Sequence, residues 1–199
     1  MLSSISPLGE RARHSRWWLT TTAYLLGSLA GGLAVGGLAA LLGGLLPDPV
    51  RDSRWTLVVV AGLLVVGLVL DLRNQRSVPS WRRQVDEQWL TRYRGWVYGV
   101  GFGAQLGFGL VTIITSTTTY AAVLLAALTH HLGAGLAIGA TFGMVRALPS
   151  LLMARVLDRA DLHRVFIRVE RWANPAGVMA KVALGGAAAI LLAAAAYGS

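Results

Sequence analysis

The sequence of 199 residues contains no cysteine, which excludes a disulfide framework, thiolate metal sites and thiol redox chemistry. It is also poor in charge, with 14% Asp, Glu, Lys and Arg, whereas soluble domains average about 25%. Hydrophobic residues make up 55% of the chain, and its mean hydropathy is +0.58. So apolar a composition excludes an intrinsically disordered chain.

The few charges that are present are unevenly divided, with 18 Lys and Arg against 9 Asp and Glu, a net charge of +9. A nucleic-acid-binding domain would spread such charges over a soluble surface, but here long stretches carry none. Apolar stretches separated by basic loops are typical of integral membrane proteins. The sequence therefore predicts an all-α integral membrane protein whose partner is the lipid bilayer and not nucleic acid.

Five apolar segments, with little or no charge, are long enough to cross a bilayer as helices, which takes about 20 residues each. They predict one transmembrane domain over residues 17–199, after a basic segment at 1–16, with spans at 17–46, 55–72, 95–128, 132–154 and 176–197. The first segment exceeds the apolar core of about 7–15 residues found in signal peptides, so we expect it to be retained.

Arginines mark alternate loops. Fourteen lie before the first span, between the second and third, and between the fourth and fifth: Arg11, Arg13, Arg16, Arg73, Arg76, Arg82, Arg83, Arg92, Arg94, Arg155, Arg159, Arg164, Arg168 and Arg171. The other loops hold only Arg51 and Arg54. Because basic loops stay in the cytoplasm, we expect the N-terminus inside and the C-terminus outside a plasma membrane of bacterial type.

The third segment is too long for a straight crossing, since a helix over residues 96–128 would measure about 50 Å against a hydrocarbon core of roughly 30 Å. Two short crossings would place the loop with five arginines outside. We therefore expect one crossing that is tilted, kinked or locally unwound.

Two of the basic loops have the apolar spacing of surface helices with aromatic residues, typical of a bilayer interface. The apolar positions are Trp81, Val85, Trp89 and Tyr93 in one loop, and Leu162, Phe166, Val169 and Trp172 in the other. We expect Asn174-Pro175 to end the second helix. The two helices are either linkers resting on anionic lipid or binding surfaces for headgroups or a partner.

Glycines recur every four residues in two spans, at Gly99, Gly103 and Gly107 and at Gly135, Gly139 and Gly143. Small residues at this spacing let helix backbones approach closely in lipid. They predict tight packing within the chain or, alternatively, a face on which helices slide or dimerise.

A run of hydroxyl residues interrupts the third span. It comprises Thr115, Ser116, Thr117, Thr118 and Thr119, with Gln105 upstream. Helix positions rotate by about 100° per residue, so these side chains cannot all face lipid. They either line a polar cavity or hinge, or bond back to their own helix carbonyls.

Arg146 is the one arginine deep inside a span, and an ionisable group there is a functional hypothesis by default. It either pairs with Asp71 at the inner end of span two, reaches carbonyls and headgroups by snorkelling, or binds an anionic ligand. Pro149, close by, is expected to loosen the helix.

Other polar residues suggest no chemistry. Lys181, the single lysine, is expected to snorkel to the inner face. His130 and His131 point in different directions with no third ligand, so we expect helix-terminal residues and no metal site. The sequence shows no nucleophile–base set, paired carboxylates or phosphate loop, so we expect neither an enzyme nor a cofactor.

The order of these features resembles a known family. The segments YLLGSLAGGLAVGGLAALLGGLLP, WTLVVVAGLLVVGLVLDL and GWVYGVGFGAQLGFGLVTIITSTTTYAAVLLAAL resemble helices of the cytochrome c biogenesis transmembrane family. That family comprises the DsbD-like thiol-electron carriers and belongs with the LysE-type exporters. The likeness covers most of residues 20–197 and consists of glycine positions and helix lengths.

The resemblance implies a broken, gating third span and a central site between pseudo-repeats. The resemblance implies that the family's first helix has no counterpart in this sequence, so we expect five spans and an internal N-terminus. The family's redox helices carry a Pro-Cys pair where this sequence has Thr115–Thr119, so thiol electron transfer does not carry over.

Two functions follow as expectations. One is a small polytopic transporter, with Gln105, the Thr115–Thr119 run and Arg146 forming a central site for a small anion. The other is a non-transporting structural or assembly subunit of a larger membrane protein complex. A homodimer would favour the transporter, and a larger complex would favour the subunit.

Overall fold

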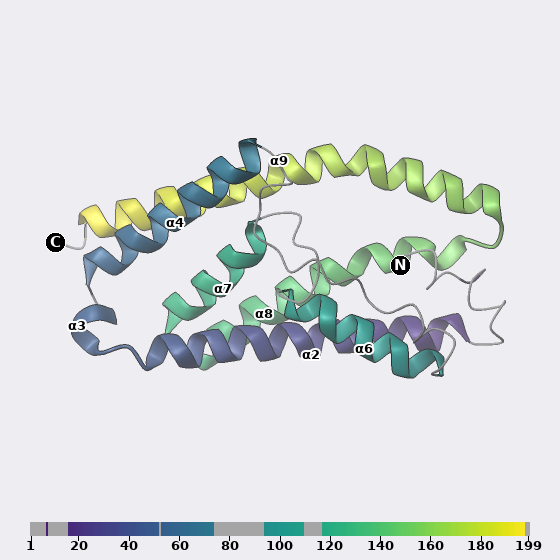
Figure 1. Cartoon of the computed structure of the whole chain (residues 1–199), viewed down its shortest axis with the longest axis horizontal. Helices are drawn as coiled ribbons and strands as arrows, with labels where there is room; N and C mark the ends of the chain where they lie inside the picture. Colours follow the sequence, from purple (N-terminus) through teal and green to yellow (C-terminus); the bar gives the residue numbers. More distant parts are fainter. Residues whose placement is uncertain (1–6, 8–15, 52, 74–93, 110–116, 198–199) are drawn as a thin grey trace.

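The computed structural model describes residue 7 and residues 16–51, 53–73, 94–109 and 117–197. Within these residues the chain is helical and has no strand, so the all-α prediction is confirmed (Figure 1). The elements are α2 (Trp17–Gly44), α3 (Asp48–Arg51), α4 (Arg54–Arg73), α6 (Gly95–Phe108), α7 (Thr118–Thr129), α8 (Leu132–Ala147), the 3-10 helix η2 (Leu148–Arg155) and α9 (Arg159–Tyr197). The surface helix expected around Trp81–Tyr93 lies outside the described residues.

Among the described residues, four stretches are long and apolar enough to cross a membrane: α2, α4, the continuous run Leu132–Ala154 of α8 and η2, and Ala160–Tyr197 of α9. Large apolar side chains such as Leu42, Val66 and Ile190 are exposed on them. An exposed apolar surface of this kind fits contact with lipid. These helices are those of a membrane protein. Helices α6 and α7 are not among the four stretches, so a fifth crossing would have to consist of these two shorter helices together.

Helix α2 lies between α6 and α8, along one side of the molecule (Figure 1). Its Gly27 meets Val100 of α6, and Gly31 meets Ala104 and Gly107, so the two helices run in the same direction. On its other face Gly32 meets Gly139 of α8 and Gly36 meets Gly135, so this pair is antiparallel.

These contacts join backbone to backbone. A Cβ added at Gly103 would overlap the carbonyl oxygen of Tyr24, and one at Gly139 would overlap that of Gly32. The Ser28 hydroxyl donates a hydrogen bond of 2.8 Å to the carbonyl of Gly143, tying α2 to α8. All six glycines singled out in the sequence lie against α2, so packing within the chain occupies both glycine faces.

A second pair of helices, α4 and α9, lies side by side across the bundle (Figure 1). Leu64 of α4, Ala121 of α7, and Leu184 and Ala188 of α9 form its buried apolar cluster. Helix α7 therefore connects the α4–α9 pair to the α2–α6–α8 group.

The described part of the third apolar segment forms two helices, α6 and α7; of the alternatives expected for this segment, tilted, kinked or locally unwound, the local unwinding matches them. Helix α6 ends at Gly109, whose φ of 68° is in the left-handed region that glycine adopts without steric cost. Helix α7 begins at Thr118, and its Ala127 meets Gly43 of α2. Since α6 packs along the first part of α2 and α7 reaches its end, the two short helices advance in the same direction along α2.

The prediction that Asn174-Pro175 ends a surface helix is wrong, because α9 continues through Pro175 to Tyr197. A proline removes one backbone hydrogen bond and usually bends the helix, but it need not end it. Alanines stand on either side of the Asn174-Pro175 pair, at Ala173 and Ala176, and Trp172 lies exposed in the same uninterrupted helix.

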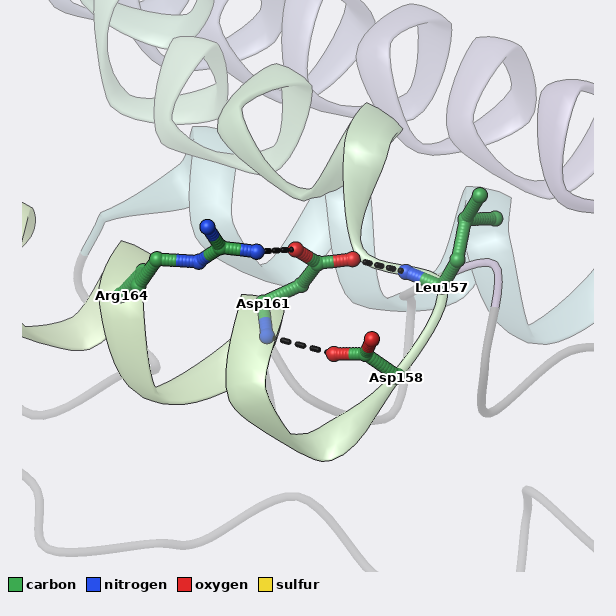
Figure 2. Close-up of polar contacts among 4 residues, drawn as sticks. All are labelled: Leu157, Asp158, Asp161 and Arg164. Atoms are coloured by element: carbon green, nitrogen blue, oxygen red, sulfur yellow. Dashed lines mark hydrogen bonds and ion pairs between the residues drawn. The ribbon is translucent and has the colours of Figure 1, made fainter.

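Helix α9 begins at a cap built from acidic side chains (Figure 2). The Asp158 carboxylate accepts a hydrogen bond of 2.7 Å from the backbone N–H of Asp161, and the Asp161 carboxylate accepts one of 3.2 Å from the N–H of Leu157. Arg164 also donates to Asp161. Reciprocal bonds of this kind satisfy the free N–H groups of a first turn. Negative charge there also interacts favourably with the positive end of the helix dipole.

We expect Gly103→Ala to destabilise the bundle by about 1–3 kcal/mol, because the new methyl group has to displace a backbone carbonyl. Gly62→Ala is the matched control, since a Cβ there meets nothing within 4 Å. The measurement is the free energy of unfolding in mixed detergent. Equal stability of the two variants would contradict the close packing of α2 and α6.

We expect the α9 cap to weaken only in strong acid. The hydrogen bond from the Leu157 N–H, followed by that from Arg164, holds the pKa of Asp161 below its usual 3.8. The stabilisation is therefore complete above pH 3.8 and is lost as the pH falls through the lowered pKa. The NMR shift of the Leu157 amide should titrate below pH 3.8, and should not titrate there in Asp161→Asn. A midpoint above 3.8 would contradict this.

Candidate functional site

The described part of the hydroxyl run lies where α7 begins. Asp71, at the end of α4, is buried, and its carboxylate accepts hydrogen bonds of 3.1 and 3.2 Å from the backbone N–H of Thr117 and one of 3.0 Å from the Thr117 hydroxyl. Asp71 thus satisfies an N–H at the start of α7 and places negative charge at the positive end of the helix dipole.

Arg146 approaches the same turn from α8. Its guanidinium donates a hydrogen bond of 3.1 Å to the hydroxyl of Thr119, and it lies 5.3 Å from the ring centre of Phe142. Gly109, where α6 ends, is next to both Thr119 and Phe142, since an added Cβ there would touch each side chain. The end of α6, the start of α7 and the last turn of α8 therefore meet at Arg146.

The two charged groups reach α7 from different sides. Thr117 and Thr119 are two residues apart, so their side chains point about 200° apart around the helix. Thr117 bonds Asp71 of α4, and Thr119 bonds Arg146 of α8. The three alternatives for Arg146 were an ion pair with Asp71, snorkelling and an anionic ligand. The structure adds a contact that was not among them, the hydrogen bond to the Thr119 hydroxyl.

The other residues of the expected site are divided. Thr118 and Gln105 are half-buried, Thr118 at the start of α7 and Gln105 on α6, whereas Thr115 and Ser116 lie outside the described residues. Tyr24 of α2 lies within electrostatic range of Arg146 and packs with Tyr98, Phe102 and Ala147. Sequence reasoning missed Tyr24 and Phe142, because an aromatic residue in an apolar helix gives no separate signal.

An open groove of about 630 Å³ runs beside this site, between α7, α8 and α9. Its walls are mostly apolar, with Arg146 and the hydroxyls Thr118 and Thr141 among the lining residues. Volumes of a few hundred Å³ to about 1,000 Å³ with few polar groups are typical of ligand pockets. The site therefore combines one cation, several hydroxyls and an apolar space.

The remaining polar residues of interest lie at helix ends or sides. His130 ends α7 with a left-handed φ of 51°, and His131 precedes α8 in extended conformation. Within the described ranges no group of three potential metal ligands occurs. Lys181 is half-buried in α9.

Comparison with known proteins finds two similar chains, both called methylamine utilization protein MauF. The chain is 30% identical over 151 residues to that of Paracoccus versutus, covering 74% of this chain and 55% of the relative. It is 29% identical over 157 residues to that of Paracoccus denitrificans, covering 74% and 54%. The chain thus spans about half the length of the curated relatives it matches. No described protein family and no solved structure matches.

Proposed function

We propose that this chain is a multi-pass plasma-membrane protein that binds a small anion at Arg146 and carries it across the membrane. The observation that supports the proposal is the hydrogen bond from Arg146 to Thr119 at the interruption between α6 and α7. Discontinuous helices at the level of the bilayer commonly surround the binding sites of transporters. The resemblance to the LysE-type exporters points the same way.

The proposed threading has five crossings, with α6 and α7 together forming the third. These helices are about 21 Å and 18 Å long, from 14 and 12 residues, so neither spans a core of roughly 30 Å alone. Their common direction along α2 favours a single interrupted crossing. The N-terminus is then cytoplasmic, and the loop between α3 and α4 is outside.

The ligand is proposed to be an anion because of the charge at the site. A guanidinium in a low-dielectric surrounding favours carboxylate or phosphate, which it binds with two parallel hydrogen bonds. Methylamine, in contrast, is protonated at neutral pH, as is the amine of lysine. Arg146 would repel that cation, so methylamine does not fit as the ligand of this site.

A second candidate follows from the name of the two relatives. The chain would then be a non-transporting subunit that supports methylamine utilization, held in a membrane complex by its exposed apolar helix faces. The long exposed stretch of α9 around Trp172 offers a surface for such an assembly.

The threading can be tested with single cysteines, because the natural chain has none. We expect Ser53→Cys, between α3 and α4, to react with a membrane-impermeant maleimide in intact cells. We expect His163→Cys, on exposed α9, to react only after the membrane is opened. The reverse labelling would contradict the proposed orientation.

The site can be tested by anion flux in proteoliposomes. We expect Arg146→Gln to lower flux by at least tenfold, since it removes the charge that binds the anion. Thr119→Val should lower it less, and Arg73→Gln, a change at an exposed arginine of α4, should leave it unchanged. Equal flux in Arg146→Gln and the native chain, with other subunits co-purifying in fixed ratio, would favour the second candidate.

A further inference from the structure

The groove between α7, α8 and α9 has a polar end and an apolar end. Thr118 is the first residue of α7, and Arg146 lies in the last turn of α8, so both line the polar end of the groove. Leu125 on α7 and Ile138 on α8 line it further along. Ile138 and Arg146 are eight residues apart (146 − 138), which along a helix is about 12 Å.

The walls beyond Arg146 are made of small or aliphatic side chains. Ala121, Ala122, Ala137, Ala183 and Ala187 leave the space open, and within the described part of the chain no charged residue lines the groove except Arg146. Val145, which also lines the groove, is 58% exposed. A slender apolar chain fits along these walls, and an anionic head fits beside the guanidinium.

We propose that this groove binds an anionic phospholipid of the surrounding bilayer, with its phosphate at Arg146 and one acyl chain against the alanines of α7 and α9. The inference rests on the proposed membrane placement of α7, α8 and α9, which opens the groove to lipid. Arg146 then has two alternative ligands, the lipid phosphate and the small anion of the proposed function.

Charge and threading both favour a lipid as the occupant. By the arginine distribution, the Arg146 end of α8 is nearer the cytoplasmic side, and the cytoplasmic leaflet carries the anionic lipids. Basic pockets between transmembrane helices on that side bind such headgroups. A small soluble anion would bind the guanidinium of Arg146 but would not fill the apolar part of the groove.

The test measures lipid binding to the purified full chain by native mass spectrometry, with phosphatidylglycerol and phosphatidylcholine as probes. We expect phosphatidylglycerol to bind at least tenfold more tightly. Arg146→Gln should weaken its binding by about tenfold, the loss of a charge-assisted contact. Ala187→Phe should do the same by filling the groove, without any change in charge.

Two variants serve as matched controls. Arg73→Gln removes an exposed arginine away from the groove, and Ala194→Phe adds the same ring to an exposed position of α9 beyond it. Both should bind phosphatidylglycerol within twofold of the native chain. Should Arg146→Gln not fold, Arg146→Lys keeps the charge but loses the paired geometry, and a several-fold loss is expected.

Three results would overturn the lipid site. These are equal binding of the two lipids, an equal loss in Arg73→Gln and Arg146→Gln, or unchanged binding in Ala187→Phe. If inorganic phosphate binds through Arg146 while Ala187→Phe has no effect, the site takes a soluble anion only, and the proposed transport stands without the lipid. Lipid binding that depends on both residues in a chain without anion flux would instead remove the transport proposal alone.

Discussion

The contact of α2 with α6 on one face and α8 on the other fixes the position of every other part of the site. At the level of Ser28 the three backbones converge: its carbonyl lies against Gly107 of α6 and Gly143 of α8, and its hydroxyl bonds the Gly143 carbonyl. Gly107 is one residue before Phe108, the last residue of α6, and Gly143 is three residues before Arg146. The contacts of Ser28 therefore fix two positions along the axis of α2: the position of the end of α6 and the position of Arg146 on α8.

The interruption between α6 and α7 leaves backbone polar groups without hydrogen-bond partners in their own helix. These are the first N–H groups of α7. In an apolar surrounding each unpaired group costs several kcal/mol. Asp71 of α4 accepts from Thr117, and the Thr119 hydroxyl accepts from Arg146, so a carboxylate and a guanidinium flank one helical turn. The positive end of the α7 dipole favours Asp71, and the Thr119 hydroxyl and the Phe142 ring favour Arg146.

Much of this arrangement can be predicted from the sequence, because glycine spacing and apolar length are local properties. The four-residue repeats of Gly99–Gly107 and Gly135–Gly143 predicted close packing, and Arg146 and the threonines were identified as belonging together. The pairing of both glycine faces with the single helix α2 is a long-range property that periodicity does not encode. The sequence offers Asp71 as a partner for Arg146, but the contact of Asp71 with the N–H of Thr117 depends on where α7 begins. The Asn174-Pro175 pair predicts a helix end, but the effect of a proline depends on the neighbouring turns, and α9 continues through it.

The same choice of small residues has opposite consequences on the two sides of α8. Toward α2, glycines let the backbones touch, so no space remains and the register is fixed. Toward α7 and α9 the small residues are alanines such as Ala137 and Ala183, which neither touch across the gap nor fill it. The gap has Arg146 at one end, where α8 gives way to the 3-10 turn of η2 that contains Pro149. A rigid contact on one face of α8 thus holds a cation at the end of an open apolar groove on the other, which is the arrangement that binding an anionic amphiphile requires.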